Sequence, residues 1–134
     1  MRAVLDTRFF VVHFLAENEE TKSKTRKILE DLQKGGNVGF VPTVVVHELY
    51  KFEMENFGRD IADIRVNVVL RSNLKTVNLD PPIAIEAAKL RYKHRDLPMA
   101  DAIIAATALE TSSDFILTDD AHIKEIKEIK TRWI

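Results

Sequence analysis

The feature that most constrains the fold is an alternation of short apolar runs with longer segments of helical periodicity. The apolar runs predict strands at residues 2–5, 38–41, 74–79, 115–117 and 129–134. The segments between them predict helices at residues 9–15, 18–34, 42–58, 59–71, 80–95, 97–112 and 122–128. Because strands that alternate with helices form βαβ units, the chain is predicted to be an α/β protein with a mostly parallel sheet, covered by helices on both faces.

Side-chain periodicity also predicts which helix faces turn inward. In the segment 59–71, the apolar residues Ile61, Ile64, Val68 and Val69 are expected to face the core. In the segment 42–58, Glu48 falls in the middle of the apolar stripe, where an unpaired carboxylate is costly. A buried ion pair with Arg8 or a lysine is the alternative to a functional role for Glu48.

Composition narrows the class of protein. The chain has 134 residues, which are expected to form one domain spanning 1–134, and its 46% apolar and 31% charged residues are typical of a globular protein. No apolar run reaches the roughly 20 residues of a membrane span, and no signal-like leader is expected. The lack of cysteine excludes a thiolate metal site and fits a reducing compartment, so we expect a cytoplasmic location. The net charge of −1 argues against binding nucleic acid through overall charge alone.

Four acids are predicted to meet at one edge of the sheet, one of them from the pair Asp119-Asp120. Asp6 follows the first strand, Asp119 and Asp120 follow the strand at 115–117, and Glu48 and Asp101 lie near the starts of helices that leave the same edge. In parallel α/β sheets, ligands bind outside the carboxyl ends of the strands. Taken singly, each aspartate also has an ordinary role, as a helix cap, as a complement to a helix dipole or in a solvated turn.

Clustered carboxylates suggest a metal-dependent reaction. Several carboxylates at one place cannot all ionise without a counter-charge, so either their pKa values rise or a cation binds. Hard divalent cations prefer oxygen ligands, and Mg²⁺ is commonly held by a few carboxylates together with substrate phosphate oxygens. The chemistry that this cluster predicts is metal-assisted attack of water on a phosphodiester.

Four motifs give the chain a resemblance to a known family. They are VLDT at the first strand, VPTVVVHEL on the helix at 42–58, ADAIIAATAL on the helix at 97–112, and FILTDD at the strand 115–117. In combination they resemble the PIN-domain ribonucleases, the family of VapC-type toxins. The resemblance implies a three-layer α/β/α sandwich, dependence on Mg²⁺ or Mn²⁺, and cleavage of single-stranded or loop RNA that leaves a 5′-phosphate.

The resemblance also assigns roles to residues. Asp6, Glu48 and Asp101 match the acids that hold the metal and support catalysis, and the fourth acid, in the Thr-x-Asp pattern, falls on Asp120. We expect supporting or substrate-binding roles for four neighbours, namely Thr7, Arg8, Thr118 and Asp119, although Arg8 has no counterpart in the family pattern. Asp119 occupies the variable place between Thr118 and Asp120.

Arg8 departs from the family pattern, in which a small polar residue most often follows Asp-Thr. An arginine at this place could bind the scissile phosphate through two hydrogen bonds. It could equally pair with an acid of the site and weaken metal binding. Because of this second reading, a non-catalytic RNA-binding or interaction module is the alternative function. A receiver or phosphatase domain fits less well, since Asp6-Thr7-Arg8 lacks the second acid of an Asp-x-Asp motif.

Partners are predicted mostly from the resemblance. It implies RNA as substrate, an antitoxin protein as partner and a homodimer. The apolar helix at 9–15 is a candidate wall for an antitoxin segment or a dimer surface. Basic runs at 22–27 and 89–95 are candidate contacts with RNA, and Tyr92 could stack on a base. The four histidines are scattered and show no metal-ligand spacing.

Overall fold

The centre of the molecule is a parallel sheet of five strands in the order β3-β2-β1-β4-β5, in a computed structural model that describes residues 1–134. The strands are β1 (Arg2–Leu5), β2 (Val38–Pro42), β3 (Lys75–Val77), β4 (Phe115–Leu117) and β5 (Thr131–Arg132). The helices are α1 (Thr7–Leu15), α2 (Glu19–Leu32), α3 (Thr43–Phe57), α4 (Arg59–Leu70), α5 (Pro81–Lys93), α6 (Met99–Glu110) and α7 (Ala121–Lys124). The predicted α/β class with a parallel sheet is confirmed.

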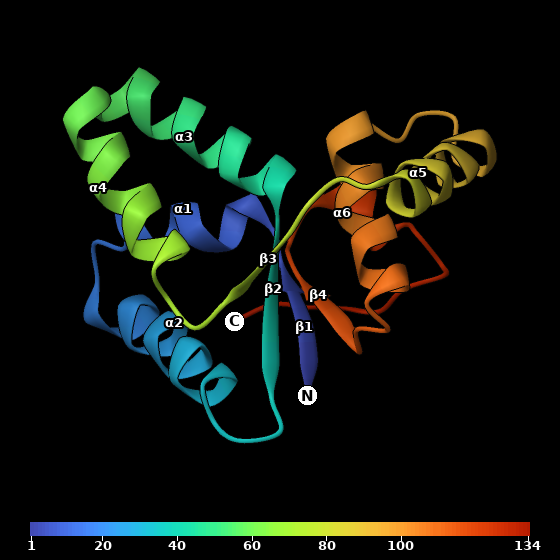
Figure 1. The fold of residues 1–134 in the computed structure, drawn as a ribbon. Coiled ribbons are helices and arrows are strands. Elements are labelled where there is room, and N and C mark those ends of the chain that lie inside the picture. Colours follow the sequence, from blue (N-terminus) through green and yellow to red (C-terminus); the bar gives the residue numbers. More distant parts are fainter.

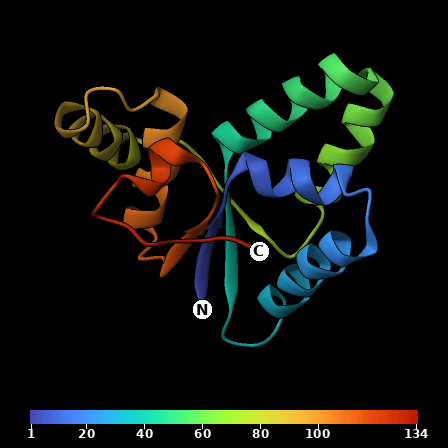
Figure 2. The ribbon, with the colours of Figure 1, turned by 180° about the vertical axis from the view of Figure 1, so that it is seen from behind.

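Helices cover both faces of the sheet. Helices α1 to α4 lie on one side and α5 and α6 on the other, and the same division is seen from behind (Figures 1 and 2). This is the three-layer α/β/α sandwich that the resemblance implied. No helix has the length and apolar character needed to span a lipid bilayer.

The sheet is buried on both faces, which explains its continuous apolar strands. Ala3, Val4 and Leu5 of β1 are completely buried, and all three residues of β4 are buried. Residues Ala102 to Ala108 of α6 are buried as well, so this stretch of the helix is covered on all sides. Leu5 pairs with Leu117, so β1 and β4 end side by side, directly before Asp6 and Thr118. The register therefore brings these two chain segments to the same edge.

Several strands and helices are shorter than predicted. Strand β3 covers Lys75–Val77 rather than 74–79, because it pairs only with the last three residues of β2, and Leu79 is exposed. Strand β5 covers Thr131–Arg132 rather than 129–134, because it pairs only with two residues of the short β4. Helix α7 ends at Lys124 rather than at 128. The other boundaries fall within two residues of the predicted ones.

The predicted inward face of α4 is wrong for three of its four residues. Ile61, Ile64 and Val68 are 36%, 60% and 56% exposed, whereas Val69 is buried as expected, together with two residues that were not predicted, Ala62 and Val66.

A buried acid of α3 pairs with an arginine of α4. Glu53 of α3 is completely buried, and its Oε2 accepts a hydrogen bond from Nη1 of Arg65 at 2.7 Å. A buried carboxylate needs a partner of opposite charge. The buried residues Ala62, Val66 and Val69 follow the i, i+4, i+7 spacing of one helix face, and α4 packs against α3, so the stripe with Ile61, Ile64 and Val68 faces solvent. Apolar periodicity alone could not choose between the two stripes, because each has apolar residues at helical spacing.

Replacing Arg65 by alanine is expected to lower the free energy of unfolding by about 2 to 3 kcal/mol. The change leaves Glu53 without its charged partner, and Oε1 of Glu53 already has no hydrogen-bond partner. The measurement is urea denaturation followed by circular dichroism. The double variant Glu53→Leu/Arg65→Met is the control, and it should recover most of the loss because it removes both charges. Equal destabilisation of the single and double variants would contradict this account.

Candidate functional site

Four carboxylates line one cavity at the carboxyl edge of the sheet. Asp6 follows β1, Glu48 lies on α3, Asp101 lies in the first turn of α6, and Asp120 precedes α7. All four line a cavity of about 390 Å³, whose wall also includes Val11 and other residues of α1. The structure thus brings together the four acids that the sequence predicted to meet, from distant parts of the chain.

A buried threonine connects two of these acids. The hydroxyl of Thr118 donates to Oδ2 of Asp6 at 2.6 Å and accepts from the backbone N–H of Asp120 at 3.0 Å. Oδ1 of Asp6 accepts from the backbone N–H of Thr7 at 2.7 Å, so Asp6 also caps α1. Asp120 caps α7 in the same way, with Oδ1 accepting from two backbone N–H groups. Both aspartates therefore have the ordinary capping role, and each still presents its carboxylate to the cavity.

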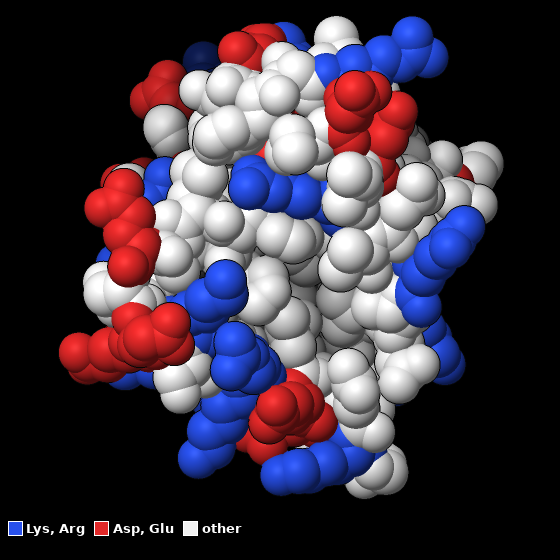
Figure 3. Space-filling view, turned by 90° about the vertical axis from the view of Figure 1, so that its left-hand side faces the viewer, with Lys and Arg blue, Asp and Glu red and all other residues white.

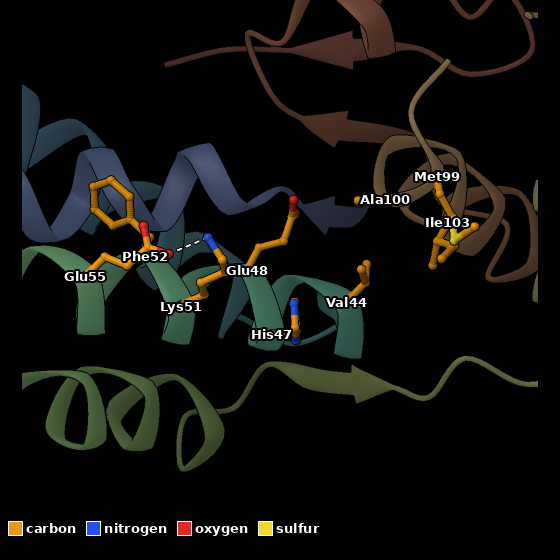
Figure 4. A pocket seen from close by; sticks show the side chains of 9 residues that line it. All are labelled: Val44, His47, Glu48, Lys51, Phe52, Glu55, Met99, Ala100 and Ile103. Carbon is orange, nitrogen blue, oxygen red and sulfur yellow. Dashed lines mark ion pairs between the residues drawn. The ribbon is translucent and has the colours of Figure 1, made fainter. Parts of the chain in front are cut away.

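A second threonine orients Glu48. The hydroxyl of Thr7 donates to Oε1 of Glu48 at 2.7 Å. Glu48 forms no ion pair, so the alternative of a salt bridge to Arg8 or a lysine is wrong. In Figure 4, the carboxylate of Glu48 points away from its helix toward the junction of β1 and α1. Thr7 and Thr118 thus each hold one acid of the cavity in place.

The electrostatics of the cavity favour a bound cation. Burial raises the pKa of Asp101 to about 7, and the carboxylates of Asp120, Asp6 and Glu48 add to the rise, while His122 opposes it. Burial likewise raises the pKa of Asp6 to about 6, with contributions from Glu48 and Asp120. No lysine or arginine forms an ion pair with any of the four acids. Because all the donors are carboxylate oxygens, the cavity suits a hard divalent cation such as Mg²⁺ or Mn²⁺.

Arg8 does not pair with any of these four acids. Its guanidinium forms a two-bond ion pair with the carboxylate of Asp119, through Nε and, at 3.0 Å, through Nη2. The hydrogen bond lowers the pKa of Asp119 and raises that of Arg8. Arg8 also lines the acidic cavity, whereas Asp119 does not. Asp119 therefore holds the arginine at the rim of the cavity.

His122 is a neighbour of the site that sequence reasoning missed. Its Nδ1 lies 3.7 Å from Oδ1 of Asp120 and 3.9 Å from Oδ2 of Asp101, and ligand atoms of the three residues lie within 4.8 Å of one another. An imidazole nitrogen is therefore available beside the carboxylates. The sequence carried no signal for this, because His122 and Asp101 belong to different helices and no spacing motif joins them.

The other candidate contacts are divided between the outer surface, the core and the cavity wall. Tyr92 is 85% exposed on α5, and two basic neighbours, Lys93 and His94, pair with Glu128. Within the helix at 9–15, Phe9 and Phe10 belong to the core, while Val11 and Val12 line the acidic cavity.

Comparisons with known proteins agree with the fold described above. A family model described as the PIN domain matches residues 3–129. No curated protein matches the chain closely enough to count as a relative.

Three similar solved structures show the same fold. The first, VapBC2 from Rickettsia felis bound to a DNA fragment from its promoter, has a TM-score of 0.79 at 14% identity, and the match covers 100% of this chain and 99% of that one. The sarcin-ricin-loop-cleaving toxin VapC20 of Mycobacterium tuberculosis has a TM-score of 0.71 at 14% identity and coverage of 91% and 92%. A toxin–antitoxin complex from Klebsiella pneumoniae has a TM-score of 0.67 at 17% identity and coverage of 92% and 90%.

Proposed function

Since the chain belongs to the PIN domain family, we propose that it is an endoribonuclease that depends on Mg²⁺ or Mn²⁺ and acts as the toxin of a toxin–antitoxin pair. The observation that carries the proposal is the convergence of Asp6, Glu48, Asp101 and Asp120 on one cavity, where no lysine or arginine forms an ion pair with any of them. The similar structures support the choice of substrate and partner, because one is a toxin that cleaves the sarcin-ricin loop and another is a toxin–antitoxin complex.

The four acids would hold the metal, and the threonines would keep two of those acids oriented. A divalent cation bound there would lower the pKa of a water molecule and stabilise charge on the phosphate in the transition state. Thr118 fixes one oxygen of Asp6, and Thr7 fixes one oxygen of Glu48, so both carboxylates are oriented before any ligand arrives. His122 could add a nitrogen ligand beside Asp101 and Asp120.

The test is RNA cleavage by the purified protein. Single-stranded RNA should be cut in the presence of Mg²⁺ or Mn²⁺, EDTA should stop the reaction, and added Mn²⁺ should restore it. Binding of RNA and metal without cleavage of any RNA would favour the alternative, a non-catalytic module. That alternative was motivated by Arg8, and it is weakened by the pairing of Arg8 with Asp119 rather than with the four acids.

We place Arg8 on the substrate side of the proposed site. The guanidinium of Arg8 has five N–H donors, and its ion pair with Asp119 at the rim of the acidic cavity leaves some of them free for a phosphate of the RNA strand. Because the Arg8 side chain is 55% exposed, such a phosphate can reach it.

Replacing Arg8 by alanine is expected to weaken the binding of single-stranded RNA about tenfold and to reduce the salt dependence of log K by about 0.7, the loss of one phosphate contact. Fluorescence anisotropy over a range of salt concentrations measures both quantities. Arg8→Lys is the matched variant, and it should keep the salt dependence but lose part of the affinity. If Arg8→Ala instead raises Mn²⁺ affinity and leaves RNA binding unchanged, Arg8 opposes the metal.

The exposed stripe on α4 is our proposed surface for the antitoxin. Ile61, Ile64 and Val68 face solvent on this helix, next to the exposed Phe57 at the end of α3. Figure 3 shows the side of the molecule that carries α2 and α4, where uncharged surface forms a hollow bordered by basic and acidic groups. Such a surface fits an apolar helix of a partner with charged flanks.

We also propose that the protein is a homodimer and that it is located in the cytoplasm. Analytical ultracentrifugation of the purified protein tests whether it is a dimer.

A further inference from the structure

A second cavity adjoins the acidic one. It lies between α3 and α6, has a volume of about 480 Å³, and shares Glu48 and Phe52 with the acidic cavity (Figure 4). We propose that this α3–α6 cavity binds the nucleobase of a nucleotide next to the phosphodiester that the acidic cavity cleaves. The inference rests on the proposed function, since it names where part of the substrate of that site binds.

The walls of the α3–α6 cavity are mainly apolar. Val44 and Phe52 lie on α3, and Met99 and Ile103 face them from α6 (Figure 4). Val44, Glu48 and Phe52 are four residues apart, so they share one face of α3. The acid of the proposed site therefore stands between two apolar residues of the cavity wall. A strand whose phosphate lies against Glu48 has this cavity directly beside it.

The cavity suits the flat face of a base. Its volume is within the range of roughly 300–1,000 Å³ that is usual for small-molecule sites. Phe52 supplies an aromatic ring, and aromatic rings are the usual stacking partners of unpaired bases. Met99 is 60% exposed at the start of α6, and a thioether makes favourable contacts with aromatic rings. An apolar side chain left open to water beside a catalytic acid is explained if substrate covers it.

A basic group for the backbone of the same nucleotide is also present. Lys51 lines the cavity and pairs with Glu55, which lies four residues further along α3 (Figure 4). Both side chains are more than half exposed, and such surface pairs contribute little to stability. The ammonium of Lys51 can therefore leave Glu55 for a phosphate at small cost.

The test compares two short, fluorescently labelled RNA oligonucleotides of equal length and charge, one normal and one in which every nucleotide lacks its base. Binding is measured by anisotropy in Ca²⁺, which offsets the charge of the acids. Met99→Ala should weaken binding of the normal RNA about fivefold, and Phe52→Leu about tenfold, with no change for the abasic RNA. Met54→Ala is the matched control, because it removes a similarly exposed methionine of α3 that lies outside the cavity, and it should change neither affinity.

Three results would overturn the proposal. They are equal binding of both RNAs by the wild-type protein, an equal loss for both RNAs in Met99→Ala, and a shift of Met99→Ala toward a smaller sedimentation coefficient with unchanged RNA binding. The last result would assign the cavity to an interface between two copies of the chain. Failure of the proposed function is a different result, namely no cleavage of any RNA by the wild-type protein with Mg²⁺ or Mn²⁺, and the binding assay can be scored without it because it does not depend on cleavage.

Discussion

Replacing Asp6 by asparagine is expected to lower kcat/KM for RNA cleavage by about 10³-fold or more, the size of effect seen when a group that stabilises the transition state is lost. Asparagine has nearly the same shape, and its amide oxygen can still accept the hydrogen bond from the backbone N–H of Thr7 that caps α1. The negative charge is lost, and with it a ligand of the proposed metal. Single-turnover cleavage of a labelled RNA measures the effect.

Stability separates this explanation from simple misfolding. Asp6 is 4% exposed and lies beside two other carboxylates, so removal of its charge should keep the Tm of the metal-free protein equal to that of the wild type or raise it. Asp60→Asn is the control, because Asp60 is an exposed acid on α4, away from the cavity. A variant Asp6→Asn that is stable and cleaves RNA at the wild-type rate would contradict the assignment of Asp6.

The metal-free protein is expected to lose stability as the pH rises from about 4 to 8. The pKa of Asp6 is raised to about 6 and that of Asp101 to about 7, whereas both are near 3.8 when the chain is unfolded. Between these values, the folded state holds protons that the unfolded state has released, so the free energy of unfolding falls with increasing pH. Asp6 alone accounts for about 3 kcal/mol of this loss, and Asp101 adds to it.

Thermal denaturation in EDTA at several pH values measures this loss. Mn²⁺ should reverse it, and the gain in Tm should be much larger at pH 8 than at pH 5, because the cation binds ionised carboxylates. The variant Asp6→Asn/Asp101→Asn is the control and should show a nearly flat profile over the same range. A wild-type protein whose stability rises from pH 4 to pH 8 in EDTA would contradict the raised pKa values.

The strands, the helices and the meeting of the four acids could be predicted from the sequence because each follows from a local pattern. Apolar runs end at Asp6 and Asp119, and in a parallel sheet those ends lie on the same edge. Glu48 stood out because it interrupts an apolar stripe.

Pairings across space could not be predicted in the same way. The buried face of α4 depends on how this helix packs against α3, and the place of His122 depends on how α7 packs beside α6. From the sequence, Arg8 could bind either a substrate phosphate or an acid of the site. In the structure Arg8 pairs with Asp119, the acid that does not line the cavity. Sequence motifs indicate which residues lie near the carboxyl edge of the sheet, but only the three-dimensional structure shows which of these residues are in contact.

The most direct test of the central claim titrates Mn²⁺ into metal-free protein and follows metal binding and RNA cleavage in the same samples. The four-carboxylate site predicts that cleavage is absent in EDTA and rises in proportion to the bound Mn²⁺. Changing any one of the four acids to its amide should reduce both binding and cleavage. Cleavage that continues in EDTA, or full Mn²⁺ occupancy without cleavage of any RNA, would contradict the claim.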